Sequence, residues 1–354
     1  MNLITREQTR KIKVGNLQIG NNKNIIIQSM TNIKTEKYDE VLNQILKLAV
    51  LGCDLIRVSI LDDADIYSLS KLVKSSPIPI VADIHFDYTL ALKAIQAGVA
   101  KIRINPGNLL DKQKVEEIVS LAKKNNVAIR IGVNSGSLPQ DIQQKYGREP
   151  IALIEAAKRY IKILEDKEFY NIVISLKSSD PITTIKAYEL AAQEFKYPLH
   201  LGVTEAGEGA DGIIKSVVGL SPLLMKGIGD TIRISLTNDP TEEIYVAKKL
   251  LNVLNLRNDI VDIVSCPTCG RLEYDLFETV KQVKELTKNI NKKIKISVLG
   301  CVVNGIGEGK EADFGVAGNK DFGIIFKKGK IYKQVPKSEI MNELKKLIEN
   351  YQEE

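Results

Sequence analysis

The chain has 354 residues, 44% of them hydrophobic, and a formal net charge of +6. This composition is typical of an ordered globular protein with room for one large domain and one small one. The basic residues are dispersed without aromatic–basic interleaving, which argues against a nucleic-acid binder. The start of the chain lacks the apolar core of a signal peptide, and no apolar run has the length of a membrane span. The chain also has only four cysteines, which is typical of proteins in a reducing compartment. We therefore expect a cytoplasmic protein.

Short runs rich in β-forming residues recur eight times, at 24–30, 55–60, 78–85, 101–106, 128–134, 171–178, 199–206 and 231–237. Between them lie stretches with helical periodicity, at 38–51, 89–97, 112–125, 151–166, 182–195 and 209–224. Strands that are apolar on both faces and alternate with helices indicate parallel βαβ units. Eight such units predict an α/β fold, a closed (β/α)8 TIM barrel over residues 1–257. The alternative is an open doubly wound sheet, although no G-x-G-x-x-G follows the first strand.

The connection 135–170 is the longest in the predicted barrel, and we expect an extra turn or a lid there. A helical run over 239–256 follows the eighth strand. Residues 258–354 then predict a small α+β module. Its expected elements are strands at 260–265 and 293–299, a helix at 276–290, a hairpin of 322–326 with 330–335, and a closing helix from 338.

Active sites of TIM barrels lie at the carboxyl ends of the strands. These ends bring cations from five strands: Arg57, Arg103, Arg130, Lys177 and Arg233. They also carry the polar residues Asp83, His85, Asn105, Asn134 and Glu205. Each arginine alone could be a surface or salt-bridged residue, but two carboxylates cannot neutralise five cations, and unpaired buried cations are costly. The set therefore predicts a site for a phosphate or diphosphate, which the planar donors of arginine suit.

Two further polar residues receive structural interpretations. His200 begins its predicted strand, at the opposite end from the site, and is expected to be structural. Cys53 precedes the second strand and is expected to be a small buried hydrophobe.

Three of the four cysteines fall in two short segments of the second module, as Cys266 and Cys269 in a Cys-x-x-Cys and as Cys301 after a predicted strand. The only histidines, His85 and His200, are far away in the sequence, which disfavours an ordinary zinc set. Three thiolates without a fourth indicate an iron–sulfur cluster with one iron left for a weaker ligand, for which Glu308 is the candidate. A structural zinc site and unpaired buried cysteines are the alternatives.

The last barrel helix, of ~15 residues and about 22 Å, should return the chain to the amino-terminal face of the barrel. The module would then lie below its own barrel, on the side opposite the anion site. We therefore expect a head-to-tail homodimer in which each module caps the barrel of the other chain.

The cysteine motifs, with Gly305, Gly307 and Glu308, resemble those of the bacterial 4-hydroxy-3-methylbut-2-enyl diphosphate synthase family of the methylerythritol phosphate route to isoprenoids. The barrel segments 27–31, 82–86, 103–108 and 202–207 are similar to that family as well, and the resemblance extends from about Thr9 to the carboxyl terminus. One departure is Ile306, where the family usually has proline, in the loop that carries Glu308.

The resemblance implies that 2-C-methyl-D-erythritol 2,4-cyclodiphosphate is opened and dehydrated with two electrons, giving (E)-4-hydroxy-3-methylbut-2-enyl diphosphate. It implies a 4Fe-4S cluster held by Cys266, Cys269, Cys301 and Glu308, reduced by flavodoxin or ferredoxin. The substrate-binding residues would be Arg57, His85, Arg103, Asn105, Arg130, Asn134, Lys177 and Arg233. Glu205 would handle protons, and Glu308 would yield an iron to the substrate. The competing hypothesis is a zinc-stabilised barrel that binds a phosphorylated ligand without redox chemistry.

Overall fold

The computed structural model describes residues 3–85, 87–104, 112–288, 290–301, 309, 311–318 and 320–351. The chain divides into two compact units, the first ending at Arg257 and the second beginning at Asn258. Within the described residues, no helix has both the length and the apolar character needed to cross a bilayer.

The first unit is a barrel of eight parallel strands in the order β8-β7-β6-β5-β4-β3-β10-β9. The strands are β3 (Ile26–Met30), β4 (Leu55–Ile60), β5 (Ile80–Ile84), β6 (Lys101–Ile104), β7 (Ala128–Asn134), β8 (Ile172–Lys177), β9 (His200–Leu201) and β10 (Thr231–Ile232). A parallel bridge between Ile174 and Leu199 joins the two ends of this order and closes the barrel. The predicted α/β barrel is therefore confirmed, and the open sheet is excluded.

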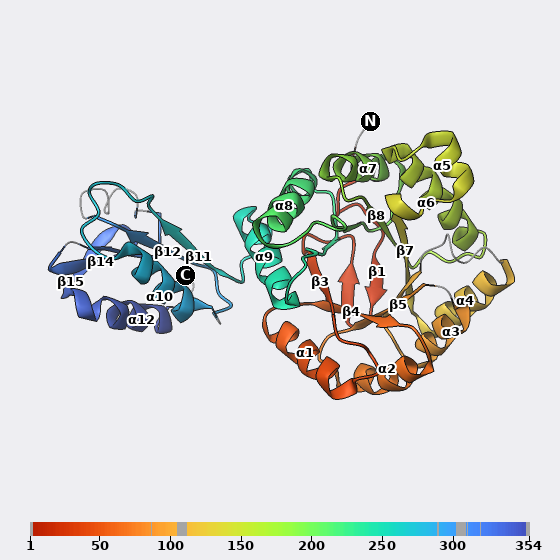
Figure 1. The fold of residues 1–354 in the computed structure, drawn as a ribbon, viewed down its shortest axis with the longest axis horizontal. Helices are drawn as coiled ribbons and strands as arrows, with labels where there is room; N and C mark the ends of the chain where they lie inside the picture. The colour runs from red at the N-terminus through yellow and green to blue at the C-terminus, as the bar shows by residue number, and fades with distance from the viewer. Residues whose placement is uncertain are drawn as a thin grey trace. The chain divides into compact units, whose positions relative to one another are not determined.

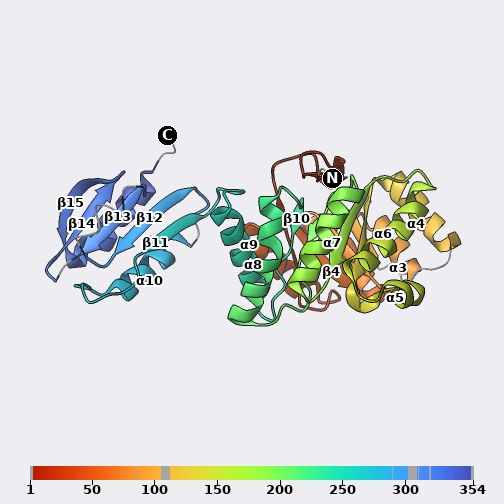
Figure 2. The ribbon, with the colours of Figure 1, turned by 90° about the horizontal axis from the view of Figure 1, so that it is seen from above.

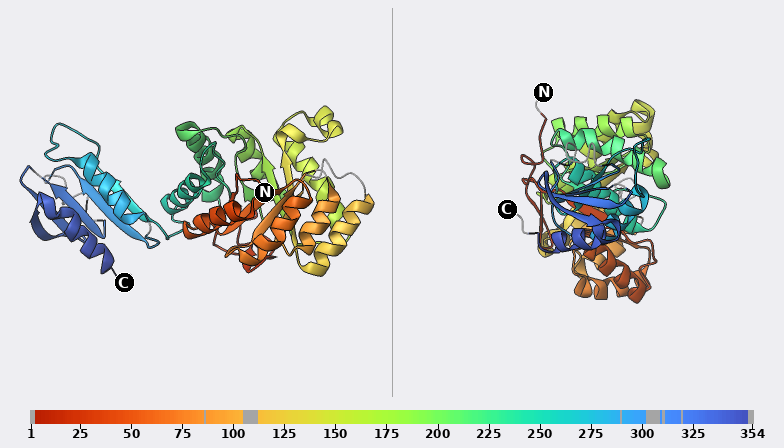
Figure 3. Two further views of the ribbon diagram at one scale, coloured as in Figure 1. Left: turned by 60° about the horizontal axis from the view of Figure 1, so that its bottom comes forward. Right: turned by 90° about the vertical axis from the view of Figure 1, so that its left-hand side faces the viewer.

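Helices surround the strands as a ring (Figure 1), seen from other directions in Figures 2 and 3. They are α1 (Tyr38–Val50), α2 (Asp63–Ser75), α3 (Tyr88–Gln96), α4 (Lys112–Asn125), α6 (Pro150–Glu165), α7 (Pro181–Glu194), α8 (Gly209–Met225) and α9 (Pro240–Val253). Their apolar faces and the outward side chains of the strands form the main core. The long connection before α6 holds a 3-10 turn, Ser135–Ser137, and helix α5 (Gln140–Tyr146), in the place where an extra turn was expected.

The last two strands are much shorter than their apolar runs predict, with two residues each. After Leu201 the chain leaves the extended conformation, since Glu205 has a φ of 53° and Gly207 a φ of 108°. The amide of Thr204 donates to Ser178 O at 3.1 Å, so the chain still follows β8. The residues expected as strand are therefore a loop over the carboxyl end of the barrel.

A hairpin that the sequence analysis did not anticipate packs against the amino-terminal end of the barrel. It consists of β1 (Ile12–Val14) and β2 (Leu17–Ile19), paired antiparallel. Ile12, Val14 and Ile19 pack against the lowest inward residues of the strands, which are Ile26, Leu55, Val81, Ala128 and Val173. Nearby, the buried guanidinium of Arg6 donates from Nε to Gly229 O at 2.9 Å and from Nη2 to Leu224 O at 3.0 Å. The barrel interior is thus apolar and closed at this end.

The second unit is a five-stranded sheet in the order β11-β12-β13-β14-β15. Its elements are β11 (Val261–Ser265), α10 (Leu276–Thr287), β12 (Ile294–Leu299), β13 (Phe314–Gly318), β14 (Phe322–Lys327), β15 (Lys330–Pro336) and α12 (Ile340–Glu349). The first three strands are parallel, and the last two form an antiparallel hairpin. Helices α10 and α12 pack against the sheet around a separate core (Figure 1). The predicted α+β module has this form, with β13 as a strand that the sequence analysis missed.

Candidate active site

Above the apolar layer, the barrel interior is polar and strongly cationic. Successive residues of a strand point to opposite faces, so every second residue of each barrel strand faces inward. Arg57, Arg103, Arg130, Lys177 and Arg233 take such positions on or directly after five strands. Arg103 and Arg130 are direct neighbours in the pairing of β6 with β7. The structure therefore brings all five cations of the sequence analysis into one interior.

Asp83, the inward residue near the end of β5, connects several of these side chains. One of its carboxylate oxygens accepts from Arg103 Nη1 at 3.0 Å, and the other lies 3.6 Å from Arg57 Nε. His85 Nε2 lies 3.4 Å from the same carboxylate and 3.0 Å from Arg103 Nη1. Burial alone would raise the pKa of Asp83, but Arg57, the hydrogen bond from His85 and Arg103 hold it well below its usual range. Asp83 is therefore a fixed negative charge.

A second carboxylate comes from outside the barrel strands. Glu243, on α9, is buried and accepts from Arg233 Nη2 at 3.1 Å and from Ser29 Oγ at 2.8 Å. Nothing in the α9 sequence distinguishes Glu243 from the neighbouring Glu242, so sequence reasoning missed it. Its carboxylate orients Arg233 and neutralises one charge.

Lys101 adds a sixth cation that the sequence analysis did not select. It lies two residues before Arg103 on the same inward face of β6 and is fully buried. Its Nζ contacts Gln28 Oε1 at 3.3 Å. Burial, reinforced by Arg130 and Arg57, holds the pKa of Lys101 well below its ordinary value. The alternation Lys101-Ile102-Arg103-Ile104 was the available signal for this residue.

The described interior has a positive excess. Six basic side chains face two carboxylates, Asp83 and Glu243. Among the described residues, several buried donors have no hydrogen-bond partner, namely Arg103 Nε, Arg130 Nε, Arg130 Nη1 and Gln28 Nε2. Burial lowers the pKa of Arg130 and of Lys177 well below their ordinary values, with further contributions from the neighbouring arginines. Unpartnered donors next to uncompensated positive charge favour an anionic ligand.

Two glycines, Gly132 on β7 and Gly202 directly after β9, leave space for these head groups. A Cβ atom added at Gly132 would lie 2.7 Å from Arg103 Nε. A Cβ atom added at Gly202 would lie 2.7 Å from Lys177 Nζ. Any larger residue at either position would displace a cation of the site.

The remaining residues predicted for the barrel have varied positions. Asn134 is half-buried at the end of β7, paired in register with Lys177. Glu205 is exposed in the loop after β9. His200, expected to be structural, is fully buried inside the barrel, with Nδ1 2.7 Å from Thr231 Oγ1. Asn105 lies outside the described residues.

The cysteine motifs follow neighbouring strands of the second unit. Because β11 and β12 are parallel partners, with Ser265 in register with Val298, the segments after both strands lie at one end of the sheet. There the amide of Gly300 donates to Cys266 Sγ at 3.2 Å, which places Cys266 beside the segment that carries Cys301. Cys269 is exposed, and hydrogen bonds from Arg271 lower its pKa. Tyr274, whose pKa is raised by burial and by Cys266 and Cys301, packs below them.

The chemistry of this donor set fits an iron–sulfur group, since thiolates are its usual ligands and an amide hydrogen bond to sulfur is a common support. In the described part of the chain, no three His, Cys, Asp or Glu side chains converge on one point. Glu308 and Ile306 lie outside the described residues. The adjacency of Cys266 and Cys301 is thus the geometric support for a cluster site.

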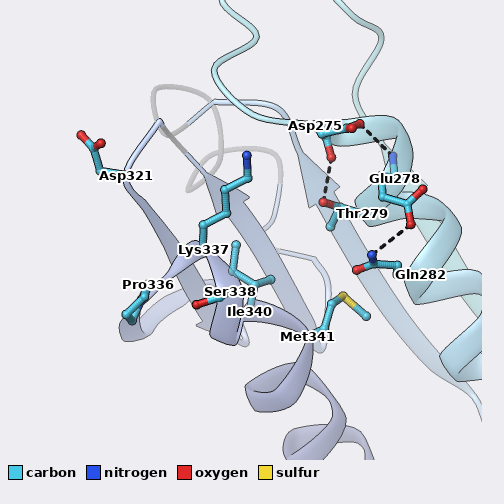
Figure 4. A pocket seen from close by; sticks show the side chains of 10 residues that line it. All are labelled: Asp275, Glu278, Thr279, Gln282, Asp321, Pro336, Lys337, Ser338, Ile340 and Met341. Carbon is cyan, nitrogen blue, oxygen red and sulfur yellow. Dashed lines mark hydrogen bonds between the residues drawn. The ribbon is translucent and has the colours of Figure 1, made fainter.

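A groove of about 680 Å³ lies elsewhere on the second unit. It is lined by the start of α10 and the segment after β15, with Asp275, Asp321, Lys337 and Met341 among its residues (Figure 4). Asp275 caps α10 by accepting from the amide of Glu278 at 3.0 Å. None of the cysteines or barrel cations lines this groove. A second groove of about 690 Å³ borders Arg10 and the ends of α6 and α7, away from the site residues as well.

Comparison with known families matches both units. The family model described as the GcpE TIM-barrel domain matches residues 9–248, and that described as the GcpE protein C-terminal domain matches residues 262–350. A protein of Malacoplasma penetrans is 51% identical over 343 residues, 97% of this chain and 95% of its own length. A protein of Mycoplasmoides gallisepticum is 52% identical over 346 residues, 98% of this chain and 96% of its own length. Both are named 4-hydroxy-3-methylbut-2-en-1-yl diphosphate synthase (flavodoxin).

Solved structures resemble the fold at much lower identity. The type I 3-dehydroquinate dehydratase of Clostridium difficile superposes with a TM-score of 0.52 at 15% identity, covering 70% of this chain and 97% of that one. At this identity the likeness concerns the fold alone.

Proposed function

The chain belongs to the GcpE family, and we propose from this that it is a 4-hydroxy-3-methylbut-2-enyl diphosphate synthase of isoprenoid biosynthesis. The substrate is 2-C-methyl-D-erythritol 2,4-cyclodiphosphate. Its ring is opened and it is dehydrated with two electrons, giving (E)-4-hydroxy-3-methylbut-2-enyl diphosphate. The comparisons give no support to a zinc-stabilised binding protein without redox chemistry.

The observation that carries this proposal is the cationic barrel interior. A cyclic diphosphate offers several anionic oxygens, and the described interior has more cations than carboxylates and several unpartnered donors. Arg130, which has two donor nitrogens without a hydrogen-bond partner among the described residues, is the central ligand for the diphosphate. The other substrate-binding residues are Arg57, His85, Arg103, Lys177 and Arg233, with Asn105 and Asn134 as orienting groups.

Asp83 has a positioning role in this arrangement. By holding Arg103 and Arg57 through one carboxylate, it fixes two guanidinium groups before the substrate arrives. Prearranged donors lose little conformational entropy on binding. Glu205, exposed in the loop after β9, is proposed as the residue that handles protons.

The second unit is proposed to hold a 4Fe-4S cluster through Cys266, Cys269, Cys301 and Glu308. When bound, the cluster supplies electrons one at a time and a Lewis-acidic iron. Glu308 is the ligand best suited to be displaced, because a carboxylate binds iron through a harder and weaker donor than a thiolate does. Tyr274 supports this end of the sheet, since its hydroxyl donates to Leu299 O at 2.8 Å.

Two protein partners belong to the proposal. Flavodoxin is the electron donor, in line with the names of the relatives; ferredoxin is the alternative donor. A second copy of the chain forms a head-to-tail homodimer, so that the cluster-bearing unit of one protomer acts on substrate in the barrel of its partner. A monomer that retains full activity when loaded with cluster would contradict this arrangement.

The test is anaerobic reconstitution with iron and sulfide, followed by turnover of the cyclodiphosphate with a one-electron reductant. We expect four irons and four sulfides per chain and formation of the open-chain diphosphate. One zinc per chain, with binding but no turnover of the cyclodiphosphate, would instead establish the zinc-stabilised alternative.

A further inference from the structure

The hairpin of β14 and β15 carries an unusual concentration of positive charge. Residues 322–338 contain five lysines and no aspartate or glutamate. The lysines are Lys327, Lys328, Lys330, Lys333 and Lys337. β15 is the last strand of its sheet, and six of its seven residues are exposed. The charge therefore lies along an open sheet edge.

Several lysines near the helices of the second unit have carboxylate partners. Directly after α10, Lys288 lies 2.6 Å from Glu285, and on α12, Lys346 lies 2.8 Å from Glu343. On the hairpin, Lys333 shares Glu343 at 3.1 Å. Lys327, Lys330 and Lys337 have no carboxylate within salt-bridge distance among the described residues. The hairpin therefore carries a net positive charge, whereas α10 and α12 each contain equal numbers of lysines and glutamates.

Two large apolar side chains lie in the middle of this charge. Ile331 is 57% exposed and Tyr332 is 53% exposed. A small apolar centre within a charged rim is the usual composition of transient protein interfaces, and redox encounters belong to the smallest of these. The hairpin edge offers both parts.

The position of β15 in the sheet relates this edge to the cysteines. Leu299, at the end of β12, is in register with Ala317, Ala317 with Ile324, and Ile324 with Gln334 of β15. Three strand spacings separate β15 from the strand that leads to Cys301, which corresponds to roughly 14 Å. Because β15 runs toward the same end of the sheet as β12, Lys337 lies at the end that carries the thiols.

We propose that the exposed side of the β14–β15 hairpin, with Lys327, Lys330, Lys337, Ile331 and Tyr332, is the docking surface for an acidic one-electron carrier protein of the flavodoxin class. This inference rests on the proposed function, because it assigns the place at which the electrons enter. Positive charge along the edge accelerates the encounter with an acidic partner and orients it, while a small contact area allows rapid release between two single-electron deliveries.

Lysines on an edge strand also prevent pairing of one sheet edge with another. This role and the docking role are separable, because only docking depends on which reductant is used. A small reductant such as dithionite with methyl viologen reaches a cluster without a protein interface, so it serves as the reference reaction.

The experiment compares the wild type with a Lys327→Glu, Lys330→Glu, Lys337→Glu variant of the full-length, cluster-loaded protein. We expect kcat/KM for reduced flavodoxin to fall by about tenfold or more, with a weaker dependence on ionic strength, while turnover with the small reductant stays within about twofold. A matched control replaces three exposed lysines of the barrel unit with glutamate, as Lys123→Glu, Lys124→Glu and Lys215→Glu. Its activities with flavodoxin and with the small reductant should both stay unchanged.

Unchanged flavodoxin-supported kcat/KM in the hairpin variant would overturn the proposal. If the glutamate variant misfolds, a variant with Lys→Gln at the same three positions replaces it. Its kcat/KM for reduced flavodoxin should show a smaller decrease, and its turnover with the small reductant should not change. Equal decreases with both reductants would overturn the proposal. Failure of the proposed function gives a different result, since the wild type would then not convert the cyclodiphosphate with either reductant.

Discussion

Lys101 reaches across the barrel interior to Gln28, with its Nζ 3.3 Å from Gln28 Oε1. The two residues belong to β6 and β3, which are separated in the sheet by β4 and β5. The contact holds a fully buried amine against a neutral amide, next to Arg130 and Arg57. The ligand-free protein therefore holds a buried amine that has no carboxylate partner among the described residues, directly below the anion site.

We expect Lys101→Met to increase the free energy of unfolding of the ligand-free protein by roughly 1–3 kcal/mol, because methionine fills similar space without a buried amine. Urea unfolding followed by circular dichroism measures this. The exposed Lys123→Met serves as the control and should change the value by less than about 0.5 kcal/mol. A clear loss of stability in Lys101→Met would mean that the amine has a stabilising role that the contact with Gln28 does not explain.

Gly132→Ala should weaken substrate binding without unfolding the barrel. The new Cβ atom would meet Arg103 Nε at 2.7 Å, and the flexible guanidinium would have to move. We expect the Kd for the cyclodiphosphate to increase about tenfold, equivalent to about 1.4 kcal/mol, in isothermal titration. Gly136→Ala is the matched control, because nothing lies within 4 Å of its added Cβ atom. Equal affinities of the two variants would remove Arg103 from the binding site.

Cys301→Ser should abolish the broad cluster absorbance near ~400 nm, the bound iron and the turnover after anaerobic reconstitution. Cys53→Ala is the control, because Cys53 is buried in the barrel and its thiol has a pKa raised to about 12 by burial. It should retain the absorbance and the iron. Turnover that survived in Cys301→Ser with the cluster lost would contradict the redox role.

Asp230→Asn should flatten the pH dependence of stability in mildly acidic solution. Burial raises the pKa of Asp230 from 3.8 to about 6, although its carboxylate accepts from the Leu199 amide at 2.7 Å and from Thr9 Oγ1 at 2.8 Å. Between these two pKa values the folded state binds more protons than the unfolded state, so stability falls as the pH rises. The loss of stability is complete once the pH exceeds the pKa of Asp230 in the folded state, and it amounts to roughly 3 kcal/mol.

Thermal unfolding of wild type and Asp230→Asn at several pH values between about 4 and 7 measures this difference. Asparagine removes the charge and keeps an oxygen for the Leu199 amide. A variant with the same pH profile as the wild type would assign the dependence to other groups.

The barrel and its cations were predictable because strand periodicity fixes which side chains face inward. The strand expected at 128–134 has the bounds observed for β7, and Arg130 faces inward by alternation. Lys101 follows the same rule, but it is the first residue of β6, far from the strand end at which the site residues of a TIM barrel are expected. Glu243 reaches Arg233 from α9, a contact between elements that no local pattern encodes.

Other elements were missed for local reasons. β13 contains two glycines, which strands usually avoid, and β1 and β2 have three residues each, too few for a periodicity. The seventh and eighth strands were predicted too long because their apolar runs continue into buried loop residues, Val203 and Ile234 among them. After the seventh strand, Glu205 and Gly207 have left-handed φ values, which end the extended conformation and which the apolar pattern does not predict. The roles of the site residues stay predictions, and Asn105 and Glu308 also lie outside the described residues.

The hydrogen bonds of Arg6 have a consequence for the synthesis of this protein. Its guanidinium binds the carbonyls of Leu224 and Gly229, so the side chain acquires these partners only after more than two hundred further residues have been made. Contacts between such distant residues form slowly. Until then, the start of the emerging chain lacks the hydrogen bonds that fix it to the end of the barrel, and incompletely folded chains of this kind are prone to aggregation.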